Sequence, residues 1–165
     1  MYTTIFDFCF TAVYTLSGTV LFMNILETLK TYFMANAGNY GIKLAFLYGS
    51  YAHNNQTEES DIDVAVVFEE DRAKDEEKLF EVITDISIAT SKLSGKDVDI
   101  IRIDEDFSKP MLYYNAIIHG KPLFVCDVNY YIDYFLRALH TMEEFSGFGI
   151  KLQLEMANKQ LRSIA

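Results

Sequence analysis

Apolar residues along the chain fall into short runs and into stretches with helical spacing, separated by glycine-containing or polar segments. The runs at 42–48, 61–68 and 98–103 predict buried strands, and 123–126 predicts a further short extended piece. Helical spacing of apolar residues predicts helices at about 24–34, 69–94, 110–119, 129–145 and 151–163. This order of helices and strands indicates an α+β or α/β domain and leaves the topology of its sheet open.

Local residues also predict where several helices begin and end. Asn24 is expected to cap the first helix, with Glu27 as its reciprocal partner. Residues 36–41 are expected to form a turn, because asparagine and glycine recur there. Serine and glycine at 146–149 are expected to separate the last two helices.

The overall charge limits the class of partner. The chain carries a formal net charge of -10, and such a surface repels the phosphate backbone of a nucleic acid. We therefore expect no direct nucleic-acid partner, whereas a nucleotide can bind where metal ions neutralise the local acids. Cys9 and Cys126 have neither a metal-ligand spacing nor a disulfide framework, so we expect inert buried thiols in a reducing cytoplasm.

The first 22 residues form a largely apolar extension. They lack the basic region that a secretory signal needs. Their length permits a membrane span, but Asp7, Gly18 and several hydroxyl residues disfavour one. We therefore expect no membrane anchor, and we interpret 1–22 as an accessory extension or as sequence upstream of a true start at Met23.

Two pairs of aspartates carry the first chemical signal. Asp61 and Asp63 flank Ile62 at the start of one predicted strand, and Asp97 and Asp99 repeat the pattern on the next. Side chains alternate along a strand, so the members of each pair share a face. Neighbouring carboxylates repel one another and favour a compensating cation, for which a hard ion such as magnesium is suited. We prefer Asp99 to Asp97 as the third acid because it lies deeper in its strand.

Gly49 and Ser50 carry the second signal, directly after the strand at 42–48. A strand that ends in Gly-Ser and enters a turn or helix exposes backbone N–H groups to a phosphate. Glycine allows close approach of the backbone, and the serine hydroxyl adds a donor. Two metal ions held by the aspartates would then clamp the attacking and leaving oxygens of a nucleotidyl transfer.

Together, Gly49-Ser50 and Asp61-x-Asp63 resemble the signature of the DNA polymerase beta nucleotidyltransferase superfamily. The short chain is most similar to minimal nucleotidyltransferases, the MntA-like antitoxins of HEPN-domain toxins. The resemblance implies a small mixed β-sheet flanked by helices, with C-terminal helices. It also implies Asp61, Asp63 and Asp99 as ligands of two magnesium ions, Asp99 as general base, and Gly49 and Ser50 as triphosphate binders. On this interpretation, 23–126 is the nucleotidyltransferase domain and 127–165 a C-terminal helical segment.

The resemblance implies transfer of AMP from ATP to a tyrosine of a HEPN ribonuclease toxin, in complex with that toxin. Two alternatives stay open: adenylylation of a small hydroxylated molecule such as an aminoglycoside, and a non-catalytic antitoxin that acts by binding alone. The histidines are interpreted as solvated residues. Six aromatic residues of the last third could stack an adenine, but we interpret them mainly as core or interface packing residues: Tyr113, Tyr114, Tyr130, Tyr131, Tyr134 and Phe135. The last four are also candidate anchors for a protein partner.

Overall fold

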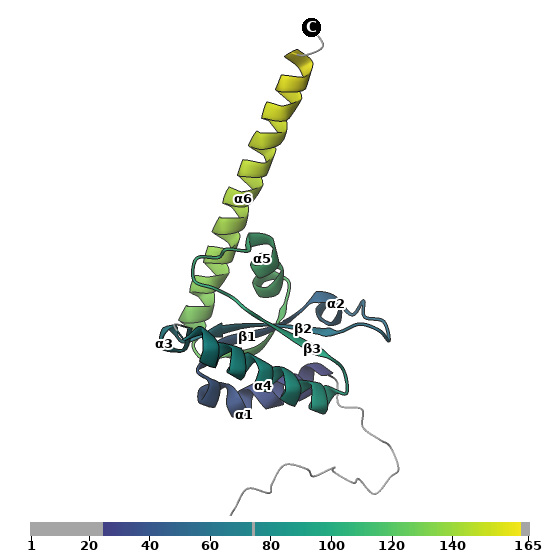
Figure 1. Ribbon diagram of the computed structural model, residues 1–165, viewed down its shortest axis with the longest axis vertical. Coiled ribbons are helices and arrows are strands. Elements are labelled where there is room, and N and C mark those ends of the chain that lie inside the picture. The colour runs from purple at the N-terminus through teal and green to yellow at the C-terminus, as the bar shows by residue number, and fades with distance from the viewer. Residues whose placement is uncertain (1–24, 74, 163–165) are drawn as a thin grey trace, which may run out of the picture.

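The computed structural model describes residues 25–73 and 75–162, and it describes side chains at 25–71 and 75–151. Helices and strands alternate through most of this range (Figure 1). In chain order, the elements are α1 (Ile25–Tyr40), β1 (Ile42–Tyr48), α2 (Gly49–His53), β2 (Ile62–Phe68), α3 (Glu70–Ala73), α4 (Glu76–Ser94), β3 (Val98–Arg102), α5 (Pro110–Ile118), β4 (Lys121–Val125) and α6 (Val128–Arg162).

The four strands form one mixed sheet in the order β3-β2-β1-β4. The central strands β1 and β2 are antiparallel, as are β1 and β4, whereas β2 and β3 are parallel. The parallel pair is connected by α4, because a parallel connection needs a crossover rather than a tight turn. The mixed sheet flanked by helices is confirmed.

Helices cover both faces of the sheet (Figure 1). On one face, α1 and α4 bury Phe33 and Ile86 against strand residues such as Val64. On the other face, α5 and α6 bury Tyr113 and Tyr134 in a second apolar cluster. The central strands β1 and β2 contribute to both clusters, which is why their sequences are almost continuously apolar.

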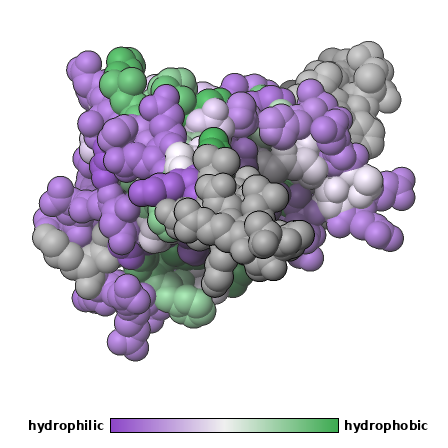
Figure 2. Space-filling model, turned by 90° about the horizontal axis from the view of Figure 1, so that it is seen from above, coloured by the Kyte–Doolittle hydropathy of each residue, from purple (hydrophilic) through white to green (hydrophobic). Residues whose placement is uncertain are grey.

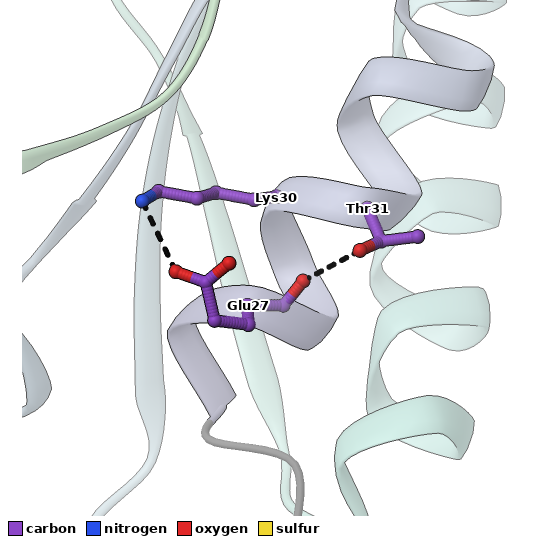
Figure 3. A network of polar contacts seen from close by, with 3 residues as sticks. All are labelled: Glu27, Lys30 and Thr31. Atoms are coloured by element: carbon purple, nitrogen blue, oxygen red, sulfur yellow. Dashed lines mark hydrogen bonds and ion pairs between the residues drawn. The ribbon is translucent and has the colours of Figure 1, made fainter.

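The start of α1 carries a small polar network (Figure 3). Lys30 Nζ lies 3.2 Å from Glu27 Oε1, and the Thr31 hydroxyl donates a hydrogen bond to the Glu27 carbonyl oxygen at 2.8 Å. The carboxylate of Glu27 is thus paired with Lys30. The predicted cap, Asn24, lies outside the described residues.

The predicted turn at 36–41 is wrong, because α1 continues to Tyr40. Phe33 and Ala37 lie four residues apart and are both buried, so the helical face that they share extends along the sheet. Asn36 donates its side-chain amide to the Tyr32 carbonyl at 2.8 Å. Burial of this face outweighs the weak helix propensity of asparagine and glycine.

The helix predicted from residue 69 is divided in the structure. Asp75 caps the N-terminus of α4, because its Oδ1 accepts a hydrogen bond from the Lys78 N–H at 3.2 Å. A new helix therefore begins after Asp75. The predicted end is confirmed: α4 stops at Ser94, and Gly95 follows in the left-handed region with φ 69°.

The predicted break at 146–149 is also wrong, because α6 runs without interruption and its outer part extends beyond the domain (Figure 1). A glycine inside a helix costs about 1 kcal/mol relative to alanine. The helix-favouring residues on both sides of 146–149 outweigh this cost. In the described part of the chain, every helix is too short or too polar to cross a membrane.

The surface is largely hydrophilic in the view along α6, with small apolar patches (Figure 2). Cys126 is exposed, so the expectation of a buried thiol is wrong at this position. It follows β4 directly, and its N–H donates a hydrogen bond to the Lys43 carbonyl at 3.0 Å. Cys9 and the 1–22 extension lie outside the described residues.

Candidate active site

Three strands bring their polar residues into one row across the sheet. Tyr48, the last residue of β1, is paired with Asp63 of β2, and Asp63 is paired with Asp99 of β3. Directly paired residues project to the same side of a sheet. Ala65 lies two residues after Asp63 and belongs to the cluster under α5 and α6, so the row lies on that face.

Asp61 and Asp97 lie one step before their strands. Asp61 is exposed, and the Ile62 N–H donates to the Asp97 carbonyl at 2.9 Å, which fixes the start of the β2–β3 ladder. Both residues line a surface hollow of about 360 Å³, together with Ser91 of α4 and with Gly95, which follows that helix. The structure therefore separates Asp97, beside this hollow, from Asp99, beside Asp63.

The sequence Tyr48-Gly49 turns directly from β1 into α2, as predicted. Gly49 has φ 69°, a conformation that favours glycine. A Cβ atom at this position would lie 2.1 Å from Oδ2 of Asp63 and 3.0 Å from its Cγ. The absence of a side chain at Gly49 therefore creates the space that the Asp63 carboxylate occupies. Ser50 follows in the first turn of α2.

The electrostatics of the row follow from this crowding. Partial burial raises the pKa of Asp63, and the neighbouring charges of Asp99 and, more weakly, Asp61 raise it further. Burial likewise raises the pKa of Tyr48 to about 12, with further contributions from Asp63 and Asp99. The Tyr48 hydroxyl therefore stays protonated at neutral pH. The carboxylates of Asp61, Asp63 and Asp99, in contrast, repel one another. A bound cation would relieve this repulsion.

Comparisons with known proteins identify the family of the chain. A family model described as "Polymerase beta, Nucleotidyltransferase" matches residues 27–129, which is more than half of the chain. The chain belongs to this nucleotidyltransferase family. A Methanocaldococcus jannaschii protein, whose name proposes that it is a protein adenylyltransferase, is 36% identical over 77 residues, or 47% of this chain and 73% of that protein.

Solved structures show the same nucleotidyltransferase fold. A chain from a toxin–antitoxin complex with AMP-PNP superimposes with a TM-score of 0.54 at 18% identity, covering 79% of this chain and 98% of its own. A chain from a complex of a tri-AMPylated Shewanella oneidensis HEPN toxin with its MNT antitoxin gives 0.50 at 16% identity, covering 82% and 98%. At these identities the likeness establishes the polymerase beta-like fold.

The donor set fits the metal that a nucleotidyltransferase of this family would use. Within 25–71 and 75–151, no three carboxylate, imidazole or thiol groups are already placed around one point. Asp61 and Asp99 are exposed, however, so their side chains can rotate toward the half-buried Asp63. Carboxylate oxygens are the ligands that magnesium prefers. A cation beside Asp63 would offset the burial and the neighbouring charges that raise the pKa of this carboxyl.

Two histidines that lie far apart in the sequence meet beside the nucleotidyltransferase motif. His53 ends α2 and His119 follows α5, yet their ring centroids lie 6.4 Å apart. Tyr114 of α5 meets His119 edge-on at 5.2 Å. No local pattern links histidines so far apart in the chain, and only the packing of α5 beside β1 brings them together.

Proposed function

We propose that this nucleotidyltransferase acts in the cytoplasm and transfers AMP from ATP to a tyrosine of a cognate HEPN ribonuclease toxin, for which it is the antitoxin. The observation that carries the proposal is the row of Tyr48, Asp63 and Asp99 with Gly49 against Asp63. This row places the Gly-Ser motif and two acids of the family signature side by side, at the end of β1.

The proposed roles follow the family motif. Asp61, Asp63 and Asp99 hold magnesium, and Gly49 and Ser50 hold the triphosphate. When bound, the two ions neutralise phosphate charge and polarise the reacting oxygens. Asp99 accepts the proton of the acceptor hydroxyl, whose oxygen bonds to the α-phosphorus of ATP while pyrophosphate leaves.

Two features support a protein acceptor. The net charge of -10 disfavours a nucleic acid, and both comparison proteins that name an acceptor concern protein adenylylation. The anchors predicted for the partner need correction, because Tyr134 is 3% exposed and Tyr130, Tyr131 and Phe135 pack against the same internal cluster. The apolar side chains that α6 leaves exposed are others, among them Val128, Ile132 and Leu136, spaced four residues apart on one face.

The proposal is tested with labelled ATP, magnesium and the toxin encoded beside this chain. Label should appear on the toxin with the unaltered protein and be abolished by Asp63→Ala. Glu70→Gln is a matched control, because Glu70 is an exposed acid just beyond the opposite end of β2. The double variant Asp61→Ala/Asp63→Ala could instead protect fully from toxicity and leave no label on the toxin. That result would contradict the enzyme and support an antitoxin that acts by binding alone.

A separate measurement tests the metal. Asp61→Asn/Asp63→Asn should weaken magnesium-dependent ATP binding, because the variant keeps the shape of both side chains and removes their charge. Calorimetric titration with ATP and magnesium measures this. Equal ATP affinity in the double variant and the unaltered chain would remove both aspartates from the nucleotide site.

A further inference from the structure

Three aromatic rings gather on the surface between α2 and the end of α5. His53 and His119 are exposed, and their ring planes are tilted by 55° at a centroid distance of 6.4 Å. Tyr114 is half-buried and meets His119 at an interplanar angle of 80°, which is an edge-to-face contact. His119 thus has two ring neighbours, Tyr114 of α5 and His53 of α2.

The two histidines lie beside the Gly49 end of the site. His53 follows Gly49 by four residues in α2, so both occupy the same face of that helix. Helical side chains lean toward the N-terminus of their helix, which directs His53 toward Gly49. On the other side, a Cβ at Gly120 would lie 2.9 Å from the Leu47 carbonyl oxygen, so the backbone after His119 packs directly on the end of β1.

We infer that His53 and His119 bind the base of the nucleotide between their rings, and that Tyr114 is a positioning residue for His119. The inference rests on the proposed function, in which the triphosphate of the same nucleotide lies at Gly49 and Ser50. A planar ring held between two others needs about 7 Å, twice the contact distance of about 3.5 Å. The observed 6.4 Å is close to this spacing, and exposed imidazoles can rotate to become parallel.

Stacking is the interaction that this geometry favours, because it uses ring faces and needs no charge on either imidazole. A purine offers a larger face than a pyrimidine, so ATP and GTP should bind more tightly than CTP and UTP. The acids of the site bind metal and phosphate and do not distinguish bases. The ring pair therefore supplies a selectivity for the base that the row of Tyr48, Asp63 and Asp99 does not.

The test compares a ligand that has a base with one that has none. Calorimetry with the full chain and magnesium measures binding of ATP and of inorganic tripolyphosphate to the unaltered protein, His53→Ala and His119→Ala. Loss of one stacking partner should weaken ATP binding by about 5- to 150-fold. Tripolyphosphate affinity should not change. His53→Phe and His119→Phe should keep ATP affinity, because phenylalanine preserves a stacking face without an imidazole.

His140→Ala is the matched control, since His140 is an exposed histidine on α6, 3.5 Å from Glu144. It should bind both ligands as the unaltered chain does. Equal weakening of ATP and tripolyphosphate by the histidine variants would show phosphate contacts and overturn the inference. Unchanged ATP affinity in both alanine variants would also overturn the inference and would leave the proposed function standing. A chain that binds neither ligand would overturn the proposed function and this inference with it.

Discussion

Gly49 and Asp63 approach so closely that the carboxylate of Asp63 occupies the space of a side chain at Gly49, with Oδ2 2.1 Å from the Cβ position. Gly49→Ala should therefore displace Asp63 and abolish magnesium-dependent ATP binding. The left-handed backbone adds a cost of about 1–2 kcal/mol for any residue with a Cβ. Calorimetric ATP titration and thermal unfolding of the variant measure the two effects.

Gly95 offers the control for this prediction. It has the same φ of 69°, but a Cβ there meets nothing within 4 Å. Gly95→Ala should lose about 1–2 kcal/mol of stability from the backbone alone and retain ATP binding. If Gly49→Ala keeps ATP affinity equal to that of Gly95→Ala, the contact with Asp63 has no role in the site.

Asp63→Asn should stabilise the metal-free protein at neutral pH. The folded state raises the pKa of Asp63, so ionisation of this group above its folded pKa costs stability. Removal of the repulsion between opposed like charges should raise Tm by about 1–4 °C at pH 7. Thermal unfolding of the variant and the unaltered chain, without magnesium, measures the difference.

The sign of this pH dependence is fixed by the direction of the pKa shift. Below the unfolded pKa of about 3.9, the carboxyl is increasingly protonated in both states and the advantage of asparagine should fade. It should develop as pH rises through the folded pKa and persist above it. An advantage that grew toward low pH would contradict the raised pKa. Glu70→Gln, at an exposed acid far from the row, serves as the control.

Asp99→Ala should lower the rate of AMP transfer about 10²- to 10⁴-fold if Asp99 is the general base. Asp97→Ala should have a smaller effect, because Asp99 is the acid that is paired directly with Asp63. Initial rates of toxin labelling at saturating ATP measure both. A larger loss in Asp97→Ala than in Asp99→Ala would reverse the assignment of the third acid.

A chain that begins at Met23 should bind ATP and transfer AMP as the full chain does. The family match runs from residue 27 to residue 129 and includes the four strands of the sheet and the acids of the row. We therefore expect these parts to act without 1–22. Activity assays and flotation with lipid vesicles compare the two chains. Vesicle association of the full chain that truncation removes would revive a membrane role for the extension.

The strands and their acids could be predicted because their signals are local. Ile42–Tyr48 is a mostly apolar run between glycines and forms β1 with the predicted bounds. The repeated acid pattern predicts Asp63 and Asp99 on strands that follow one another in the chain. The sheet order, which the sequence left open, makes these strands neighbours, and their parallel register pairs the two acids directly. The positions of the strands follow from burial, and a buried strand can be recognised in the sequence as a run of apolar residues. The positions of the acids follow from those of the strands.

The rest of the fold depends on contacts that no local pattern contains. Whether α1 stops at 36 or continues is decided by the burial of Ala37 against distant elements. The positive φ of Gly49 was also not predictable, since Gly-Ser after a strand fits several conformations. The meeting of His53 with His119 requires the packing of α5 on β1, a tertiary contact. From the sequence, Gly49 was expected to let a phosphate approach the backbone. The structure adds a second reason for glycine at this position, which is the space that the Asp63 carboxylate needs.

The mixed register around Asp63 has a consequence for the order of folding. Strand β2, which carries Asp63, has two neighbours in the sheet. Its antiparallel neighbour β1 is connected to it by the short segment that contains α2, whereas its parallel neighbour β3 is connected to it by the longer crossover through α4. Closing the longer connection costs more chain entropy. We therefore expect β1 and β2 to become protected from hydrogen exchange before β3 during refolding. ATP binding should return only with β3, and recovery of binding before β3 is protected would contradict this order.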